Sequence, residues 1–239
     1  MKIPYFLEII HHANNKDLAH IKDDDIINGD YKIYISNVLY QYNIEYQNSV
    51  LWHEFVHVFD CIRFHKNFDN AKYIGKTCSE AFATMTQLEY LRKRTTTPNK
   101  IFYENEEQTI WDVVRRFINI SDQQAKLHLK TKHPYAFDSM VSNFCYFCGG
   151  IIWAEDPIKL LKEVMTDYTP EYQKELLEIG IAILKNQHKL AGDLYGRLYE
   201  SQKAKAFIAS IRTLNAKMDI PDKIEELREE DFEVLVSRA

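Results

Sequence analysis

The sequence predicts a mainly α-helical protein with a small β-sheet near its N-terminus, an α+β fold. Three observations lead to this fold class. The 239 residues include only seven glycines, which are few for a nucleotide-binding α/β fold or an all-β fold. Apolar residues recur at helical spacing through most of the chain, whereas one segment shows the clear alternation of a strand. Apolar residues make up 46% of the chain, which is enough for a hydrophobic core.

The N-terminal part of the sequence predicts one strand, and the segment before it could be a helix or a strand. Residues 3–12 fit either a helix or a strand, and the acidic run over residues 23–25 fits a turn. Side chains over residues 31–36 then alternate as in a strand with one buried face. The two faces would carry Tyr31, Ile33 and Ile35 on one side and Lys32, Tyr34 and Ser36 on the other.

Two helices follow this strand. Residues 46–62 contain neither Gly nor Pro and supply a broad apolar surface from Val50, Leu51, Phe55, Val58, Phe59 and Ile62. Residues 77–91 form a second helical run with apolar positions Ala81, Phe82, Met85, Leu88 and Leu91. The polar segment over residues 93–100 contains Pro98 and predicts a boundary. We therefore expect a first domain over residues 1–95 and a helical region of unknown role over residues 96–239.

The signals after this boundary are almost all helical. Ser121 with Gln124 has the spacing of a capping box. Asp156-Pro157 and Thr169-Pro170 each place a capping residue before a Pro at the first helical position. Residues 221–237 predict a charged amphipathic helix. Apolar stripes that predict helix-bundle core are Leu160, Leu161 and Val164, then Leu176, Leu177, Ile179, Ile181 and Leu184, then Phe207, Ile208 and Ile211.

The first of the two N-terminal helices carries the HExxH motif at residues 53–57. Histidines four residues apart lie on one face of a helix, so His53 and His57 can bind one metal ion. Glu54 lies about a quarter-turn away, where it can hydrogen-bond a water molecule without being a ligand. In a hydrolytic zinc site the metal acidifies water and a carboxylate takes its proton. The motif therefore predicts a zincin-like catalytic core with Zn2+ on His53 and His57 and with Glu54 as general base.

A catalytic zinc normally has a third protein ligand, which should come from a later helix. Glu80 begins the second helical run and is flanked by small residues that allow the two helices to approach closely. We favour it over Glu89 and His65, which stay open as alternatives. A carboxylate that stabilises a helix N-terminus would also explain Glu80. The predicted ligand set is then His-His-Glu, as in gluzincins.

Other polar residues could support this site. Asp60 falls on the histidine face and could orient a ligand imidazole, or it could be an ordinary surface residue. A His or Tyr that stabilises the oxyanion is expected from a pool of His128, His133, Tyr135 and Tyr103. Of these, His133 and Tyr135 lie in a loop-like His-Pro-Tyr segment that could fold over a cleft.

The residues around the motif resemble the Atp23 family of metallopeptidases. Residues 53–60 read HEFVHVFD, followed by Cys61, Arg63 and the tripeptide Cys-Ser-Glu at residues 78–80. The family reads HE(L/M)(I/V)HAFD, then a segment with Cys and Arg, then CSE with small residues after it. The likeness extends from about residue 28 to about residue 88. It implies zinc on the residues at positions 53, 57 and 80, with Glu54 as the base.

The chain departs from the family pattern in two places. The interval from His57 to Glu80 is about one residue longer, and Val58 replaces an Ala. The ImmA/IrrE-like proteases also pair HExxH with a later Glu, but the Cys-Ser-Glu match favours the Atp23 family. In zincins a substrate peptide runs antiparallel to an edge strand before the metal helix. The strand over residues 31–36 is therefore either a peptide-binding edge or simple cover for the helices.

The four cysteines permit several interpretations. Cys145 and Cys148 form a CxxC pair, which could belong to a zinc knuckle or a redox site. Their apolar neighbours favour two core cysteines. Cys61 and Cys78 could approach each other if the two helices pack, and in a reducing cytoplasm all four would be thiols.

The composition argues against nucleic acid and against a membrane-spanning segment. A net charge of −5 argues against nucleic acid as the main partner. No apolar run approaches the roughly 20 residues that span a bilayer. The N-terminus is a poor secretory signal, because Pro4 and Glu8 interrupt its apolar residues. We therefore expect a cytoplasmic protein with no membrane span.

Two functions fit these observations. The first is a zinc-dependent endopeptidase that acts on a peptide or protein substrate. The second is a non-proteolytic binding or assembly module of the same fold, with a structural or lost metal. Glu54 favours the first function, since a structural metal site needs no base there.

Overall fold

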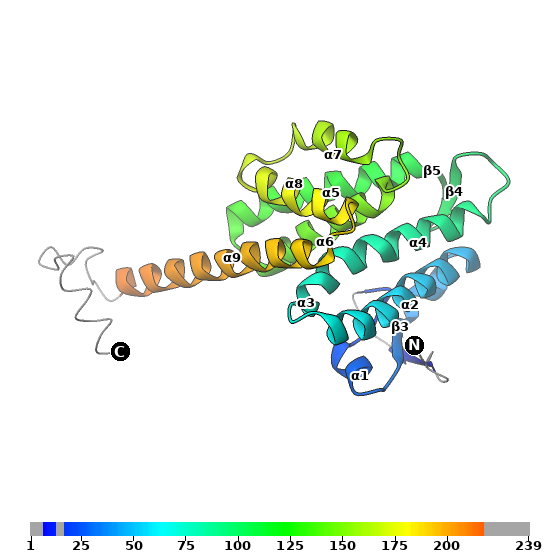
Figure 1. Cartoon of the computed structure of the whole chain (residues 1–239), viewed down its shortest axis with the longest axis horizontal. Helices are drawn as coiled ribbons and strands as arrows, with labels where there is room; N and C mark the ends of the chain where they lie inside the picture. Colours follow the sequence, from blue (N-terminus) through cyan, green and yellow to red (C-terminus); the bar gives the residue numbers. More distant parts are fainter. Residues whose placement is uncertain (1–6, 13–16, 218–239) are drawn as a thin grey trace, which may run out of the picture. The chain divides into compact units, whose positions relative to one another are not determined.

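The computed structural model describes residues 7–12 and 17–217 (Figure 1). Helices hold 73% of the described residues and strands 9%, which confirms the predicted fold class. The chain divides into two compact units, Met1–Arg197 and Leu198–Ala239. The helix predicted over residues 221–237 and the start of the element predicted over residues 3–12 lie outside the described residues. Within the described ranges, no helix is long and apolar enough to cross a membrane.

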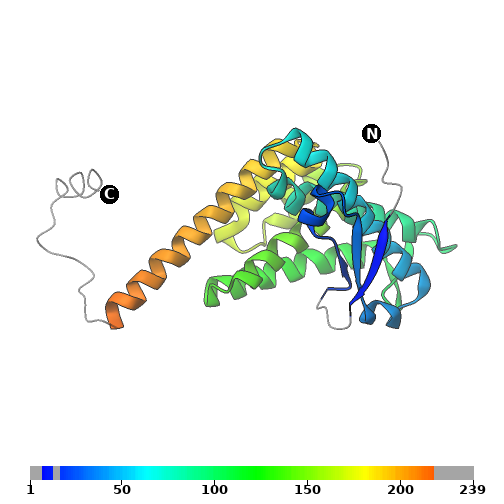
Figure 2. The ribbon, with the colours of Figure 1, turned by 90° about the horizontal axis from the view of Figure 1, so that it is seen from below.

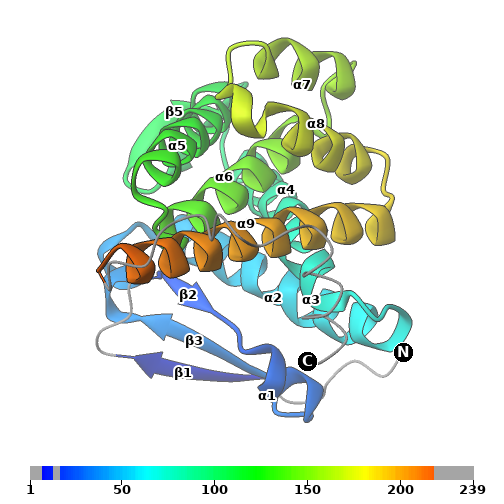
Figure 3. The same ribbon diagram turned by 90° about the vertical axis from the view of Figure 1, so that its left-hand side faces the viewer.

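The N-terminal sheet has three strands, β1 (Glu8–His12), β2 (Ala19–His20) and β3 (Lys32–Ser36). β3 lies in the middle, parallel to β1 and antiparallel to β2 (Figure 3). Both edges of β3 are therefore used inside the sheet. A peptide-binding edge over residues 31–36 is ruled out, and β2 is the outer strand next to β3.

The predicted half-exposed strand is also wrong, because residues 33–36 of β3 are all buried. Tyr34 is held on the face that was expected to be open. Its hydroxyl donates to Asp25 at 2.6 Å, and the Lys22 ammonium lies 4.3 Å from its ring centroid. The acidic run that predicted a turn forms the short helix α1 (Asp23–Ile27), since acidic side chains stabilise a helix N-terminus.

A 3₁₀ segment, η1 (Asn37–Gln41), leads from β3 to the long helix α2 (Ile44–Asn67). Asn43 caps α2 by accepting from the Tyr46 amide at 2.9 Å. The predicted helix over residues 46–62 is confirmed and extends further at both ends. α2 contacts β2 and β3, so the HExxH helix lies beside the sheet (Figure 2).

The next helical run changes its winding before Glu80. It comprises α3 (Ala71–Ile74), the π-helical segment η2 (Gly75–Ser79) and α4 (Glu80–Arg92). The predicted start at Thr77 thus falls inside the π-helical segment. The Thr77 hydroxyl donates to the Tyr73 carbonyl at 2.9 Å, and the Cys145 thiol contacts the Lys76 carbonyl at 3.7 Å. These contacts satisfy carbonyl groups where the regular helical bonding changes.

Residues 100–109 form a hairpin that the sequence did not predict. β4 (Lys100–Tyr103) pairs antiparallel with β5 (Glu106–Thr109). Only Ile101 and Tyr103 are buried in the pair, so each strand is too short for a clear alternating signal. A tight turn joins the strands, with Glu104 in the left-handed region at φ 57°.

Four helices complete the first unit before the last one begins: α5 (Ile110–Thr131), α6 (Pro134–Ile151), α7 (Pro157–Met165) and α8 (Pro170–Leu184). The helix starts predicted at Pro157 and Pro170 are confirmed. The capping box predicted at Ser121 is wrong, because Ser121 lies within α5. Its buried hydroxyl donates to the Met140 carbonyl of α6 at 2.7 Å, so a tertiary partner replaces the cap.

The last described helix, α9 (His188–Lys217), extends from the first unit into the second. The second unit is described as far as Lys217. Its apolar side chains Phe207, Ile208 and Ile211 are exposed, so the core predicted for this stripe is wrong. The two stripes predicted in α7 and α8 do supply buried residues, namely Leu161, Leu176 and Ile179.

The helix that begins at Glu80, α4, is packed against α6. Gly149 of α6 lies so close to α4 that an added Cβ would be 2.1 Å from the carbonyl oxygen of Ala81. Ala81 follows Glu80, so this close approach fixes the start of α4. The helical region predicted after residue 96 therefore contributes to the same compact unit as the HExxH helix.

We predict that Gly149→Ala lowers the free energy of unfolding by at least about 1–3 kcal/mol, because the backbone of α4 must move to admit the methyl group. Gly75→Ala is the control, since its added Cβ meets no atom within 4 Å. Urea denaturation of both variants measures the difference. A Gly149→Ala protein as stable as Gly75→Ala would contradict the close packing of α4 and α6.

Candidate metal centre

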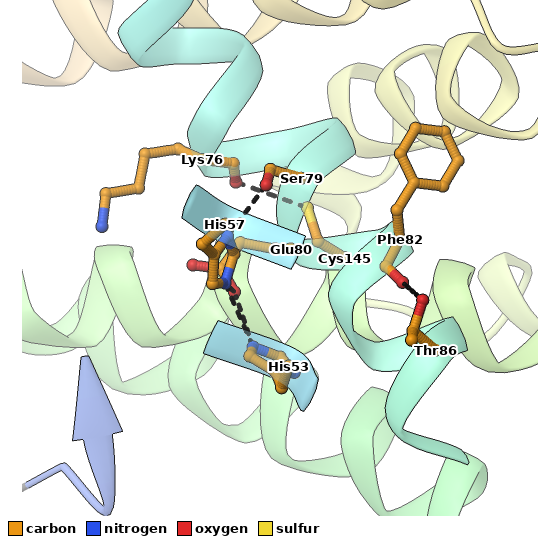
Figure 4. Close-up of polar contacts among 8 residues, drawn as sticks. All are labelled: His53, His57, Lys76, Ser79, Glu80, Phe82, Thr86 and Cys145. Carbon is orange, nitrogen blue, oxygen red and sulfur yellow. Dashed lines mark hydrogen bonds and ion pairs between the residues drawn. The ribbon is translucent and has the colours of Figure 1, made fainter. Parts of the chain in front are cut away.

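Three side chains from two helices meet at one point. His53 and His57 lie one turn apart on α2, and Glu80 is the first residue of α4 (Figure 4). The two imidazole Nε2 atoms are 3.1 Å apart. Glu80 Oε2 lies 3.6 Å from His53 Nε2 and 3.3 Å from His57 Nε2. These three residues form a group that could hold a metal ion.

The spacing of the donor atoms fits a small tetrahedral ion. Ligand atoms about 2.0–2.2 Å from zinc in a tetrahedron are about 3.3–3.5 Å from one another. The three measured separations, 3.1, 3.3 and 3.6 Å, bracket that value. Two imidazole nitrogens and one carboxylate oxygen are also a ligand set that catalytic zinc uses.

The electrostatics of the group favour a positive charge at its centre. Burial alone would lower the pKa of His57, but Glu80 and Glu54 raise it to about 9. Burial would also raise the pKa of Glu80, but the positive charge of His57 and the hydrogen bonds from His53 and His57 hold it well below its usual range. A bound cation would therefore be attracted by the carboxylates of Glu80 and Glu54, which favour a proton on His57 when no cation is bound.

Ser79 and Asp60 support His57 from the side away from the donor atoms. The Nδ1 atom of His57 is 2.8 Å from the Ser79 hydroxyl. Burial raises the pKa of Asp60, and the neighbouring Ser79 hydroxyl opposes this rise. Asp60 is 8% exposed, which rules out the ordinary surface residue that was one alternative. The negative charge of Asp60 raises the pKa of His57, whereas the hydrogen bond comes from Ser79, a residue that the sequence offered no reason to single out.

Glu54 faces the same cavity but is not one of the three donors. It is buried, at 7% exposed, and burial raises its pKa against the opposing charges of His57 and His53. A buried carboxylate beside a candidate metal site is suited to take a proton from a bound water molecule and to return it. This position is the one predicted for a general base.

The donor atoms open into a cavity of about 450 Å³. Residues of β2, α2, the π-helical segment and α6 line it, including His20, Glu54, Lys76, Tyr103 and Tyr146. β4 contributes Tyr103, and β2 is the strand of the three-stranded sheet that borders the cavity. An extended substrate could lie along this strand and reach the donor atoms.

Tyr146 of α6 also lies close to the site and was not predicted from the sequence. Its ring centroid is 5.9 Å from that of His53. The charge of Glu80, together with burial and the charge of Glu54, raises the pKa of Tyr146 well above its usual range. Its hydroxyl therefore stays protonated and able to donate. No local motif marks Tyr146, which follows Glu80 by 66 residues in the sequence.

The residues predicted to stabilise an oxyanion lie elsewhere, with one exception. His133 caps α6 and Tyr135 is 66% exposed, and neither lines the cavity. His128 is buried and hydrogen-bonded to the Tyr172 hydroxyl. Tyr103 does line the cavity. The His-Pro-Tyr segment does not fold over the site, because its Pro begins a helix instead of a loop.

The alternative third ligands are separated from the group. Glu89 binds Arg92 and Lys93 at the far end of α4. His65 lies two turns along α2 from His57, where its nearest candidate partners are Asp23 and Cys61. All four cysteines are buried free thiols, so the prediction that Cys145 and Cys148 belong to the core is confirmed.

We predict that Glu80→Gln weakens zinc binding by at least about tenfold, because the change removes the only negative charge among the three donors. Glu89→Gln should leave the affinity unchanged, since Glu89 pairs with Arg92 and Lys93 instead. Competition with a fluorescent zinc chelator measures both dissociation constants. Equal affinities in the two variants would remove Glu80 from the ligand set.

The assignment of this site rests on its own geometry and chemistry. A comparison of the chain with protein-family models, curated proteins and solved structures finds no match. The group His53, His57 and Glu80 could hold a metal ion, and Glu54, Ser79 and Tyr146 line the same cavity.

Proposed function

We propose that the protein is a zinc-dependent endopeptidase. The observation that carries this proposal is the joint placement of three metal donors and Glu54 in one cavity. A structural zinc site is usually closed by four protein ligands, whereas a catalytic site keeps a position open. The three donors here leave such a position, and a buried carboxylate lies next to it.

Zinc bound at this site would act as a Lewis acid that polarises the scissile carbonyl and lowers the pKa of water. Glu54 takes the proton of the attacking water and delivers it to the amine of the leaving peptide. The Tyr146 hydroxyl donates a hydrogen bond to the oxygen that gains negative charge. Ser79 holds the His57 ring in the orientation that points Nε2 at the centre of the group, and the negative charge of Asp60 favours a proton on this ring.

The role of Tyr146 can be tested separately from metal binding. Tyr146→Phe removes one hydroxyl and retains the ring that packs against Phe117 and His53. We expect kcat to fall by about 10²-fold, as for the loss of one oxyanion donor, with KM and zinc content unchanged. Unchanged kcat would exclude Tyr146 from the reaction.

The resemblance to the Atp23 family belongs to this proposal. The interval from His57 to Glu80 is about one residue longer than in that family, and it contains the π-helical segment η2. A π-helical turn holds more residues than an α-helical turn, so an inserted residue can be absorbed without moving Glu80. Free cysteines agree with the proposed cytoplasmic location.

A chelation experiment tests the proposed function. The purified protein is incubated with a mixed peptide library before and after removal of metal, and again after addition of one equivalent of zinc. Cleavage should stop on chelation and return with zinc. The bonds that are cleaved should be internal peptide bonds, as expected for an endopeptidase. Cleavage that persists in chelator would exclude a metallopeptidase. A zinc-loaded protein that cleaves nothing would favour the binding or assembly module.

A further inference from the structure

A second group of donor atoms continues along the same face of α2. Cys61 and His65 follow His57 at steps of four residues, so they extend the column that begins at His53. Both residues line the same cavity as the first group. The face of α2 that borders the cavity therefore presents four metal-binding side chains in succession.

Asp23 completes this second group from α1. One donor atom from each of Asp23, Cys61 and His65 lies within 4.8 Å of the other two. Cys61 is 8% exposed, and its sulfur is 3.9 Å from the Asp23 carbonyl, the one polar contact that the described residues give it. The side chains of Asp23 and His65 form no hydrogen bond or ion pair with any other described residue. All three donor atoms are thus available to a ligand.

The chemistry of the group selects a class of ion. A thiolate, an imidazole and a carboxylate together favour zinc or a similar thiophilic divalent cation over magnesium or calcium, which prefer oxygen ligands. The negative charges of Asp23 and Asp24 act on Cys61 and favour a cation beside it. Asp23 and His65 are exposed, so their side chains can move toward Cys61 to bind an ion at little cost.

We infer that Asp23, Cys61 and His65 form a second zinc site in the cavity, separate from the His53, His57 and Glu80 group. Binding there would release the Cys61 thiol proton to solvent, because the thiolate is the metal ligand. The two groups share no residue, so the second site does not depend on the proposed peptidase activity.

Cobalt can report on each site separately, because only the second has a sulfur ligand. The full-length protein is stripped of metal and titrated with Co2+ while its absorption spectrum is recorded. Wild type should bind two equivalents of Co2+. The sulfur-to-cobalt charge-transfer band should grow as the second equivalent, which binds more weakly, is added. Cys61→Ser should lose this band and bind one equivalent. His65→Asn should weaken the second equivalent by at least about tenfold, whereas His133→Asn, at an exposed helix cap, should not.

His57→Ala separates this inference from the first site. It should lose the sulfur-free equivalent and keep the sulfur band, whatever the fate of the proposed peptidase activity. His65→Asn changes an exposed side chain, so it tests the inference even where Cys61→Ser fails to fold. Saturation of wild type at one equivalent, or a sulfur band that survives Cys61→Ser, would overturn the second site.

Discussion

His57→Ala is expected to abolish zinc binding at the first site and to remove the stabilisation that zinc provides. His57 Nε2 lies 3.1 Å from His53 Nε2 and 3.3 Å from Glu80 Oε2, so its loss leaves two donors. An ion that binds only the folded protein at about 100 times its Kd stabilises it by about 2.7 kcal/mol. Wild type should gain this amount from zinc at the first site, and the variant should lose this share of the gain.

Thermal or urea unfolding with and without zinc measures this linkage. His53→Ala should behave in the same way, because it removes an equivalent donor. His133→Asn, at the exposed start of α6, is the control and should respond to zinc as wild type does. Full zinc occupancy of the first site in His57→Ala would show that the HExxH motif has no role in metal binding.

Glu54→Gln is expected to retain zinc and the fold and to lose hydrolysis by at least about 10²-fold, as for removal of a general base. The change replaces one buried carboxylate by an amide of nearly the same shape. It leaves His53, His57 and Glu80 in place, so metal content should match wild type. Single-turnover cleavage of a peptide found in the library experiment measures the loss.

Glu45→Gln provides a matched control on the same helix. The Glu45 side chain is 43% exposed and accepts a hydrogen bond from the Tyr90 hydroxyl, remote from the donor group. Its turnover should equal that of wild type. Equal turnover in Glu54→Gln and Glu45→Gln would refute the role of Glu54 as the base.

The parts of the site that the sequence predicted are those that local spacing determines. His53, Glu54 and His57 occupy one turn of a helix, so their relative positions follow from the helical repeat. Glu80 was found because it begins a helical run among small residues that allow close approach. Gly149 of α6, which holds that run in place, lies far along the chain and carries no local signal.

The errors arose where tertiary contacts outweighed local patterns. Ser121 has the spacing of a helix cap, but its hydroxyl bonds to Met140 inside a longer helix. Tyr34 alternates like an exposed strand residue, yet Asp25 and Lys22 cover it. His133 is near a Pro, as in many loops, although that Pro begins α6. In each case a residue distant in sequence or a neighbouring helix decided the outcome.

Tyr146 and Ser79 show why the supporting residues of a site are hard to predict. Ser79 is adjacent to Glu80, but its contact with His57 depends on the π-helical segment that rotates it toward α2. Tyr146 approaches from α6, and only the packing of α6 on α4 brings it near His53. Residue type and spacing give no information on either contact.

A crystal structure of the zinc-loaded protein, with anomalous scattering recorded at the zinc edge, tests the central claim most directly. We predict a peak between α2 and α4 with His53 Nε2 and His57 Nε2 at about 2.0–2.1 Å and one Glu80 oxygen at about 2.0–2.2 Å. The Glu54 carboxylate should face the open position without binding the ion. A first-site peak that leaves out Glu80, or one that takes Glu54 as a ligand, would contradict a His53, His57 and Glu80 centre served by Glu54.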